Sequence, residues 1–60
     1  MTRIEEIVFE AINLGVSDNL YKRVKKLSNK QEYRYAELQK IYEDALILEK
    51  DKLRNESGNT

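Results

Sequence analysis

The chain has 60 residues, with 11 basic and 11 acidic side chains and no cysteine or histidine. This length provides one small domain, and the missing residue types exclude disulfide bonds and an ordinary zinc site. The zero net charge excludes an overall electrostatic field that would draw the chain toward nucleic acid or an anionic membrane. So small a core has to be supported by close helix packing or by self-association.

The first expected element is a helix that begins at a capping box. Thr2 and Glu5 have the spacing at which the hydroxyl accepts a backbone N–H and the carboxylate accepts the N–H of the capping residue. Between residues 4 and 14, seven of eleven side chains are apolar. These side chains cover more than one helical stripe, so we expect this helix to contact neighbours on two sides.

A tight turn is expected at Gly15, after which a second helix begins. Glycine suits a left-handed residue just past a helix end, and Val16 is expected to fold back on the last turn. Ser17 is a natural N-cap for the next helix, and Asp18 in its first turn favours the positive end of the helix dipole. The sequence therefore specifies this turn strongly.

Beyond the turn, the sequence fits either two helices or one long bent helix. Two residue pairs have the spacing of a capping box that would start a third helix. These pairs are Ser28 with Gln31 and Asn29 with Glu32. In contrast, no glycine or proline forces a break there. Nine positions from 20 to 48 also follow an unbroken 4-3-4-3 spacing, and seven of them are apolar, which is typical of one continuous helix. Two helices are favoured, and residues 31–54 are expected to be helical in both cases.

The fold class that follows from these elements is all-α. We expect a small helical bundle or helical hairpin that forms a single domain over residues 1–54. Residues 55–60 contain no apolar side chain and are expected to form a disordered polar tail.

The C-terminal helix carries more apolar surface than one hairpin partner covers. Residues 45–48 are apolar around a full helical turn, so a second surface is needed to bury them. We therefore expect self-association through this helix, most simply as a homodimer. The residues assigned to the contact are Tyr42, Leu46, Ile47, Leu48 and Leu53.

Catalysis and ligand chemistry are not expected. No serine has a histidine base, and the carboxylate pairs at positions 5–6 and 43–44 are neighbours that point about 100° apart on a helix. The two glycines do not provide a phosphate-binding loop. We expect no enzyme activity, cofactor, metal or small-molecule substrate. No apolar run approaches the roughly 20 residues of a membrane span, and the acidic start does not resemble a signal peptide, so we expect a cytoplasmic protein without membrane association.

The charges are distributed unevenly along the neutral chain. Residues 20–30 contain five basic side chains and no acid. These residues, called the basic stripe below, are Lys22, Arg23, Lys25, Lys26 and Lys30. In one interpretation the stripe faces Glu6 and Glu10 across the turn, and the opposite charges neutralise each other. In the other interpretation the stripe stays open and binds anionic groups of a partner.

Residues 11–27 resemble the signature of helix-turn-helix DNA-binding domains. The resemblance is carried by the small residue Ala11, the glycine-valine-serine turn at positions 15–17, and the spaced apolar residues Leu20, Tyr21, Val24 and Leu27. It implies that the second helix is a recognition helix that lies in the DNA major groove. The groove-facing residues implied by the resemblance are Ser17, Asp18, Asn19, Lys22 and Arg23. The negative charge at position 18 departs from the family pattern, because it faces the DNA backbone.

The favoured function is that of a small non-catalytic helical protein-interaction module. Its size and composition suit a homodimeric regulator or inhibitor, for example a phage- or prophage-type accessory protein, that binds a larger protein. The alternative is a small helix-turn-helix transcriptional regulator that binds DNA through the basic helix at residues 18–27. Nucleic acid is therefore the second class of partner.

Overall fold

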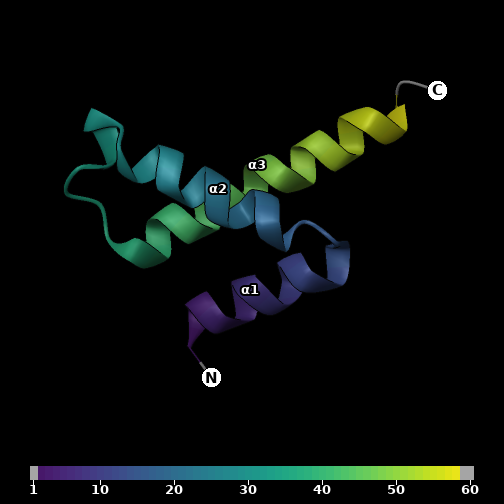
Figure 1. The fold of residues 1–60 in the computed structure, drawn as a ribbon, viewed down its shortest axis with the longest axis horizontal. Helices are drawn as coiled ribbons and strands as arrows, with labels where there is room; N and C mark the ends of the chain where they lie inside the picture. The colour runs from purple at the N-terminus through teal and green to yellow at the C-terminus, as the bar shows by residue number, and fades with distance from the viewer. Residues whose placement is uncertain (1, 59–60) are drawn as a thin grey trace.

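The computed structural model describes the backbone of residues 2–58 and the side chains of residues 2–55. It contains the helices α1 (Arg3–Leu14), α2 (Ser17–Ser28) and α3 (Leu38–Gly58), and the short 3-10 helix η1 (Gln31–Tyr33) between α2 and α3. The described part of the chain has no strand (Figure 1). The expected all-α bundle is therefore confirmed, and two helices follow the turn rather than one.

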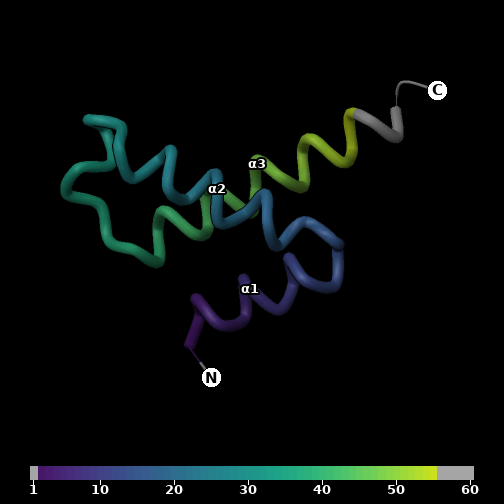
Figure 2. Tube along the Cα trace, viewed as in Figure 1, coloured from purple at the N-terminus to yellow at the C-terminus, as the bar shows by residue number. Residues whose placement is uncertain are grey.

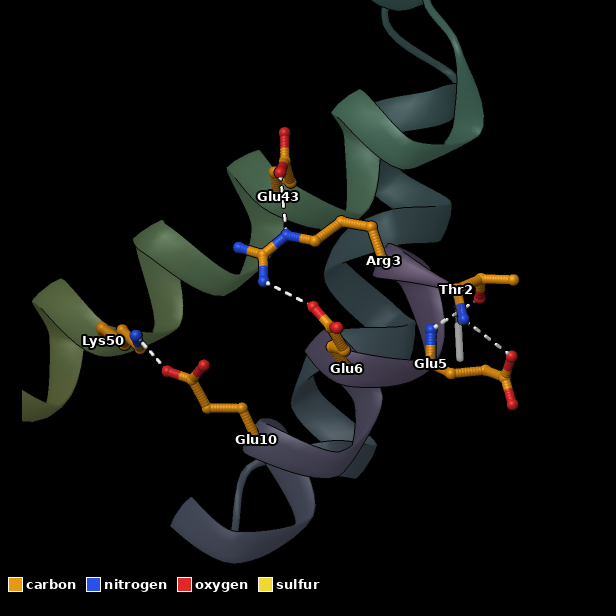
Figure 3. Close-up of polar contacts among 7 residues, drawn as sticks. All are labelled: Thr2, Arg3, Glu5, Glu6, Glu10, Glu43 and Lys50. Atoms are coloured by element: carbon orange, nitrogen blue, oxygen red, sulfur yellow. Dashed lines mark hydrogen bonds and ion pairs between the residues drawn. The ribbon is translucent and has the colours of Figure 1, made fainter.

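α1 and α3 lie side by side and run in the same direction, whereas α2 crosses α3 (Figure 1). Two ion pairs join α1 to α3 (Figure 3): Arg3 Nε lies 3.0 Å from Glu43 Oε1, and Lys50 Nζ contacts Glu10 Oε2. In both pairs the α3 residue stands 40 positions further along the chain. Because this separation is constant, a step forward along α1 is matched by a step forward along α3.

α1 begins and ends as the sequence predicts. The Glu5 N–H donates to Thr2 Oγ1 at 3.2 Å, and the Thr2 N–H donates to Glu5 Oε1 at 3.1 Å (Figure 3). Gly15 has a φ of 75°, and the N–H of Val16 donates to the Ala11 carbonyl at 2.9 Å. Because Val16 is buried, the turn both closes the helix backbone and adds an apolar side chain to the core.

The start of α2 differs from the prediction by one residue. Val16 is the N-cap, since its carbonyl accepts the N–H of Leu20 at 2.8 Å, and no side-chain hydrogen bond caps the helix. Ser17 is the first helical residue, so the prediction that it caps α2 is wrong. The reason is that the left-handed turn already fixes Val16 and positions its carbonyl for the first helical hydrogen bond.

The segment between α2 and α3 does not continue as an α-helix. Ser28 Oγ donates to the Lys25 carbonyl at 2.8 Å, so this hydroxyl completes the end of α2 and does not cap a new helix. The chain then forms η1 and reverses direction before α3 begins (Figure 2). The first hydrogen bond of α3 runs from the Ile41 N–H to the Glu37 carbonyl at 3.2 Å. The prediction of α-helix over residues 31–37 is wrong, and the 4-3-4-3 spacing through this segment does not mark one helical face.

α3 is longer than the sequence analysis predicts. Its helical backbone continues through residues 55–58, which the sequence assigns to a polar tail. Once a helix exists, each further residue adds one hydrogen bond, so residues of moderate helix propensity extend it, and Gly58 is the last helical residue that the structure describes. The tail's last two residues, 59–60, lie outside the described residues.

The core lies where the three helices meet. Its buried apolar side chains are Ile7, Ala11, Val16, Leu20, Val24, Leu27, Ile41, Ala45 and Leu46. An edge-to-face contact between Tyr21 and Tyr42, with ring centroids 6.4 Å apart, also joins α2 to α3. α2 buries a single stripe of its surface, so its opposite face is left exposed. That face carries the candidate site.

Replacing Gly15 with valine is expected to lower the free energy of unfolding by about 1–2 kcal/mol. No heavy atom outside the local chain lies within 4 Å of the place where a Cβ would stand, so the cost comes from the positive φ and not from a clash. Gly15→Asn is the matched control and should lose less, because asparagine tolerates left-handed backbone better. Urea denaturation measures both variants. Equal midpoints for the valine variant and the parent chain would contradict the prediction.

Candidate functional site

The exposed face of α2 carries three lysines of the basic stripe. Lys22, Lys25 and Lys26 are exposed, because these positions of an amphipathic helix point away from the core. Among the residues that the structure describes, none of the three ammonium groups lies within 4.0 Å of a carboxylate. These three lysines, called the lysine face below, therefore present their positive charge to solvent.

The acidic residues of α1 do not neutralise the basic stripe. Arg3 Nη1 lies 3.4 Å from Glu6 Oε1, and Glu10 pairs with Lys50 of α3 (Figure 3). The interpretation in which Glu6 and Glu10 face the stripe is wrong, because Glu6 pairs with Arg3 within α1 and Glu10 pairs with Lys50 of α3. Lys22, Lys25 and Lys26 are therefore left exposed to solvent.

Two members of the basic stripe lie away from the lysine face. Arg23 turns toward α3, where its Nε donates to the carboxylate of Glu49. The Glu49 side chain is 2% exposed, so the pair lies against the core. Lys30 lies beyond the end of α2 in extended backbone, with φ −80° and ψ 143°, and does not continue the helical spacing. The stripe is thus a face of three lysines with an arginine at its edge and a lysine in the following loop.

A hollow of about 140 Å³ lies between α2 and α3 beside the lysine face. Its lining residues are Asn19, Lys22, Arg23 and Lys26 from α2, and Glu49 and Lys52 from α3. Helical spacing groups the α2 members, and three of them belong to the basic stripe. Nothing in the sequence shows which face of α3 meets α2, so the roles of Glu49 and Lys52 emerge only from the folded chain.

The basic surface continues along α2 into the loop that follows it. One adjoining hollow is lined by Lys22, Lys25, Lys26 and Asn29, and another by Ser28, Asn29, Lys30, Gln31 and Arg34. At the opposite end of α2, Asp18 is exposed and carries the opposite charge. The surface is therefore most basic over the middle and the C-terminal half of α2.

The residues assigned to self-association divide between core and surface. Leu46 is 4% exposed and belongs to the core of its own chain, and Tyr42 and Leu53 pack against that core. Ile47 and Leu48 are 55% and 39% exposed. Of the five assigned residues, these two are the ones that offer an exposed apolar surface to a second copy.

Ile47 and Leu48 share a hollow with Tyr33 and Asp44. The Tyr33 hydroxyl donates to Asp44 Oδ2 at 2.7 Å, and Lys40 Nζ lies 3.1 Å from Asp44 Oδ1. The hydrogen bond from Tyr33, helped by Lys40, lowers the pKa of Asp44. The same hydrogen bond raises the pKa of the Tyr33 hydroxyl, because it favours the protonated form. This contact ties η1 to α3.

The helix-turn-helix resemblance rests on residues 11–27 alone. Three of the implied groove-facing residues are exposed, namely Asp18, Asn19 and Lys22. Ser17 is half-buried, and Arg23 is turned toward α3. No protein-family model, curated protein or solved structure matches the chain.

Two kinds of site are not found in the part of the chain that the structure describes. No helix there is both long enough and apolar enough to cross a membrane. No group of three or more histidine, cysteine, aspartate or glutamate side chains there is arranged to hold a metal ion.

Tyr33→Phe is expected to lower the melting temperature near neutral pH, because Asp44 loses its hydrogen bond. Since the pKa of Asp44 is lowered, this stabilisation is fully present above the ordinary value of 3.8 and is lost as the pH falls below it. Since the pKa of Tyr33 is raised, the stabilisation is fully present below 10.0 and is lost as the pH rises beyond it.

Melting curves of the parent chain and Tyr33→Phe from about pH 2 to about pH 11 measure this difference. The difference should form a plateau between the two values and shrink at both ends. Tyr35→Phe is the matched control, because Tyr35 is 91% exposed and should show no such plateau. A difference that is the same at every pH would show that the Tyr33 hydroxyl does not act through Asp44.

Proposed function

We propose that the chain is a small non-catalytic protein-interaction module that binds an acidic surface of a larger protein through the basic stripe on α2 and the loop that follows it. The observation that carries this proposal is the open face of Lys22, Lys25 and Lys26, which have no carboxylate partner among the described residues. A module of this kind regulates or inhibits its partner by occupying the partner's surface.

The lysine face adds no ion pair to the fold among the described residues. Lys22 and Lys26 stand four residues apart on α2, where like charges destabilise a helix by about 0.2–0.5 kcal/mol. Acidic groups of a partner would offset this repulsion and accept charge-assisted hydrogen bonds from the ammonium groups. Such complementarity speeds association and discriminates against wrong partners.

An acidic protein surface fits this charge distribution better than duplex DNA does. A recognition helix contacts bases mainly through its N-terminal residues, and at that end α2 has the exposed Asp18. DNA binding also draws much of its affinity from many contacts between basic side chains and phosphates, whereas this chain is neutral. DNA binding through residues 18–27 is the alternative, because exposed lysines also contact phosphates. The experiment has to exclude it.

A titration with two labelled polyanions near physiological salt tests the proposal. Poly-L-glutamate represents an acidic protein surface, and mixed-sequence duplex DNA represents the alternative. Changing Lys22, Lys25 and Lys26 together to glutamine should weaken binding of poly-L-glutamate by at least about tenfold, because charge-assisted contacts are lost. Circular dichroism should show unchanged helix content, since all three side chains are exposed.

The control variant changes Lys40, Lys50 and Arg54 to glutamine, which removes the same charge from α3. The exposed ion pairs it breaks contribute about 0–1 kcal/mol each, so this variant should stay folded and retain most of the binding. Equal losses in the two variants would refute the role of the stripe, as would failure of the parent chain to bind poly-L-glutamate. Tighter binding to DNA that fades steeply as salt rises would overturn the protein partner in favour of the helix-turn-helix alternative.

The proposal includes self-association of two copies through Ile47 and Leu48. Ile47→Asp should shift the chain toward monomer, because it places an unpaired charge in an apolar contact. The variant should remain folded, since Ile47 is 55% exposed in the single chain. Phe9→Asp is the control, because Phe9 is 51% exposed on α1 and lies outside the proposed contact. Sedimentation equilibrium measures all three chains, and a parent chain that stays monomeric at high concentration would contradict self-association.

A further inference from the structure

We infer that the hollow between α2 and α3 is a binding subsite for one phosphate monoester group. This inference rests on the proposed function, because it names the group that anchors the partner on the basic stripe. It depends on three features: the size of the hollow, the orientation of Arg23, and the charge that its lining leaves unpaired.

The size of the hollow suits a single small group. Its volume of about 140 Å³ corresponds to about four or five water molecules. Pockets that enclose a whole small-molecule ligand or cofactor start at about 300 Å³. The hollow therefore accepts one oxyanion that projects from a larger molecule, or a free oxyanion, and does not enclose a complete cofactor.

The orientation of Arg23 leaves its terminal nitrogen atoms available. Its Nε donates to the carboxylate of Glu49, and no other hydrogen bond of this guanidinium occurs among the described residues. Because Glu49 is 2% exposed and packed in place, it fixes the plane of the guanidinium beside the hollow. The free edge of an arginine has the fork geometry that binds two oxygens of a phosphate. Glu49 thus acts as a positioning residue.

The charge of the lining selects a dianion. Glu49 offsets the charge of Arg23, which leaves three lysines, Lys22, Lys26 and Lys52, without a carboxylate partner among the described residues. A phosphate monoester carries about −1.5 to −2 charges near neutral pH, whereas a carboxylate or a phosphodiester carries about −1. Asn19 adds a neutral amide donor at the same hollow. A monoester therefore matches the excess positive charge best.

Two sources provide this group, namely a phosphorylated side chain of the protein partner and free phosphate. Two-dimensional NMR titrations with inorganic phosphate and with a phosphoserine peptide distinguish them. Acetate at the same ionic strength is the carboxylate control. We expect saturable shifts of the Asn19 side-chain amide and of the Arg23 Nε–H with both phosphates and not with acetate. Tighter binding of the peptide assigns the site to a phosphorylated partner, and equal binding assigns it to free phosphate.

A pair of charge-matched variants tests the location of the site. Lys52→Gln removes a lysine of the hollow and should weaken phosphate binding by about tenfold, the effect of one lost charge-assisted contact. Lys40→Gln removes the same charge from α3, outside both the hollow and the basic stripe, and should change the affinity by less than about threefold. Both side chains are exposed, so both variants should fold.

Equal weakening by the two variants, or equal shifts with acetate, would overturn the inference, because both results indicate general charge screening. The outcomes also separate this inference from the proposed function. Binding of poly-L-glutamate without saturable phosphate binding would refute the subsite and leave the interaction module standing. Phosphate binding at the hollow without binding of poly-L-glutamate would support the subsite and refute the acidic protein surface.

Discussion

Glu49 places a carboxylate that is only 2% exposed between α2 and α3, and this determines how α2 lies on α3. A buried carboxylate without a partner costs several kcal/mol, so the fold has to bring a cation to it. Arg23 is that cation, and among the described side chains no buried polar atom lacks a hydrogen-bond partner. Since Arg23 has to reach Glu49, the flank of α2 that carries it is held against α3. Lys22 and Lys26, which flank Arg23 on α2, are thereby placed at the rim of the contact.

The distribution of ion pairs divides the neutral chain into two electrostatic regions. α1 pairs its charged side chains within itself, through Arg3 with Glu6, and with α3, through Arg3 with Glu43 and Glu10 with Lys50. α2 commits one basic side chain to the interior and leaves its lysines in solvent. Zero net charge therefore coexists with a strongly basic surface on one helix. The total charge of a small domain is a poor guide to what one of its faces binds.

Structural features that depend on a few neighbouring residues could be predicted from the sequence. Thr2 with Glu5 and the left-handed turn at Gly15 are local hydrogen-bonding arrangements, and the structure has both. The start of α3 could not be predicted, because the hydroxyl of Ser28 satisfies the end of its own helix and no comparable side chain marks position 38. The burial of residues 45–48 could not be predicted either. All four are apolar, and only packing decides that Leu46 is buried while Ile47 and Leu48 are exposed.

The candidate site was predictable on one side only. Helical spacing groups the lysines of α2, because their relation is fixed within a single element. The contribution of α3 depends on how two helices cross, and this is a property of the folded core. The two carboxylates expected to neutralise the stripe illustrate the same limit. Sequence shows that Glu6 and Glu10 are like charges four residues apart on one helix, but long-range packing decides which cations they meet.

The two ion pairs between α1 and α3 have opposite polarity, and this polarity determines the register of the two helices. Arg3 of α1 faces an acid of α3, whereas Glu10 of α1 faces a base seven residues further along α3. If α1 slipped forward by that distance, Arg3 would stand opposite Lys50. A slip backward by the same distance would place Glu10 opposite Glu43. Both slips bring like charges together, so two pairs that add little stability penalise misaligned packing of two helices with the same direction.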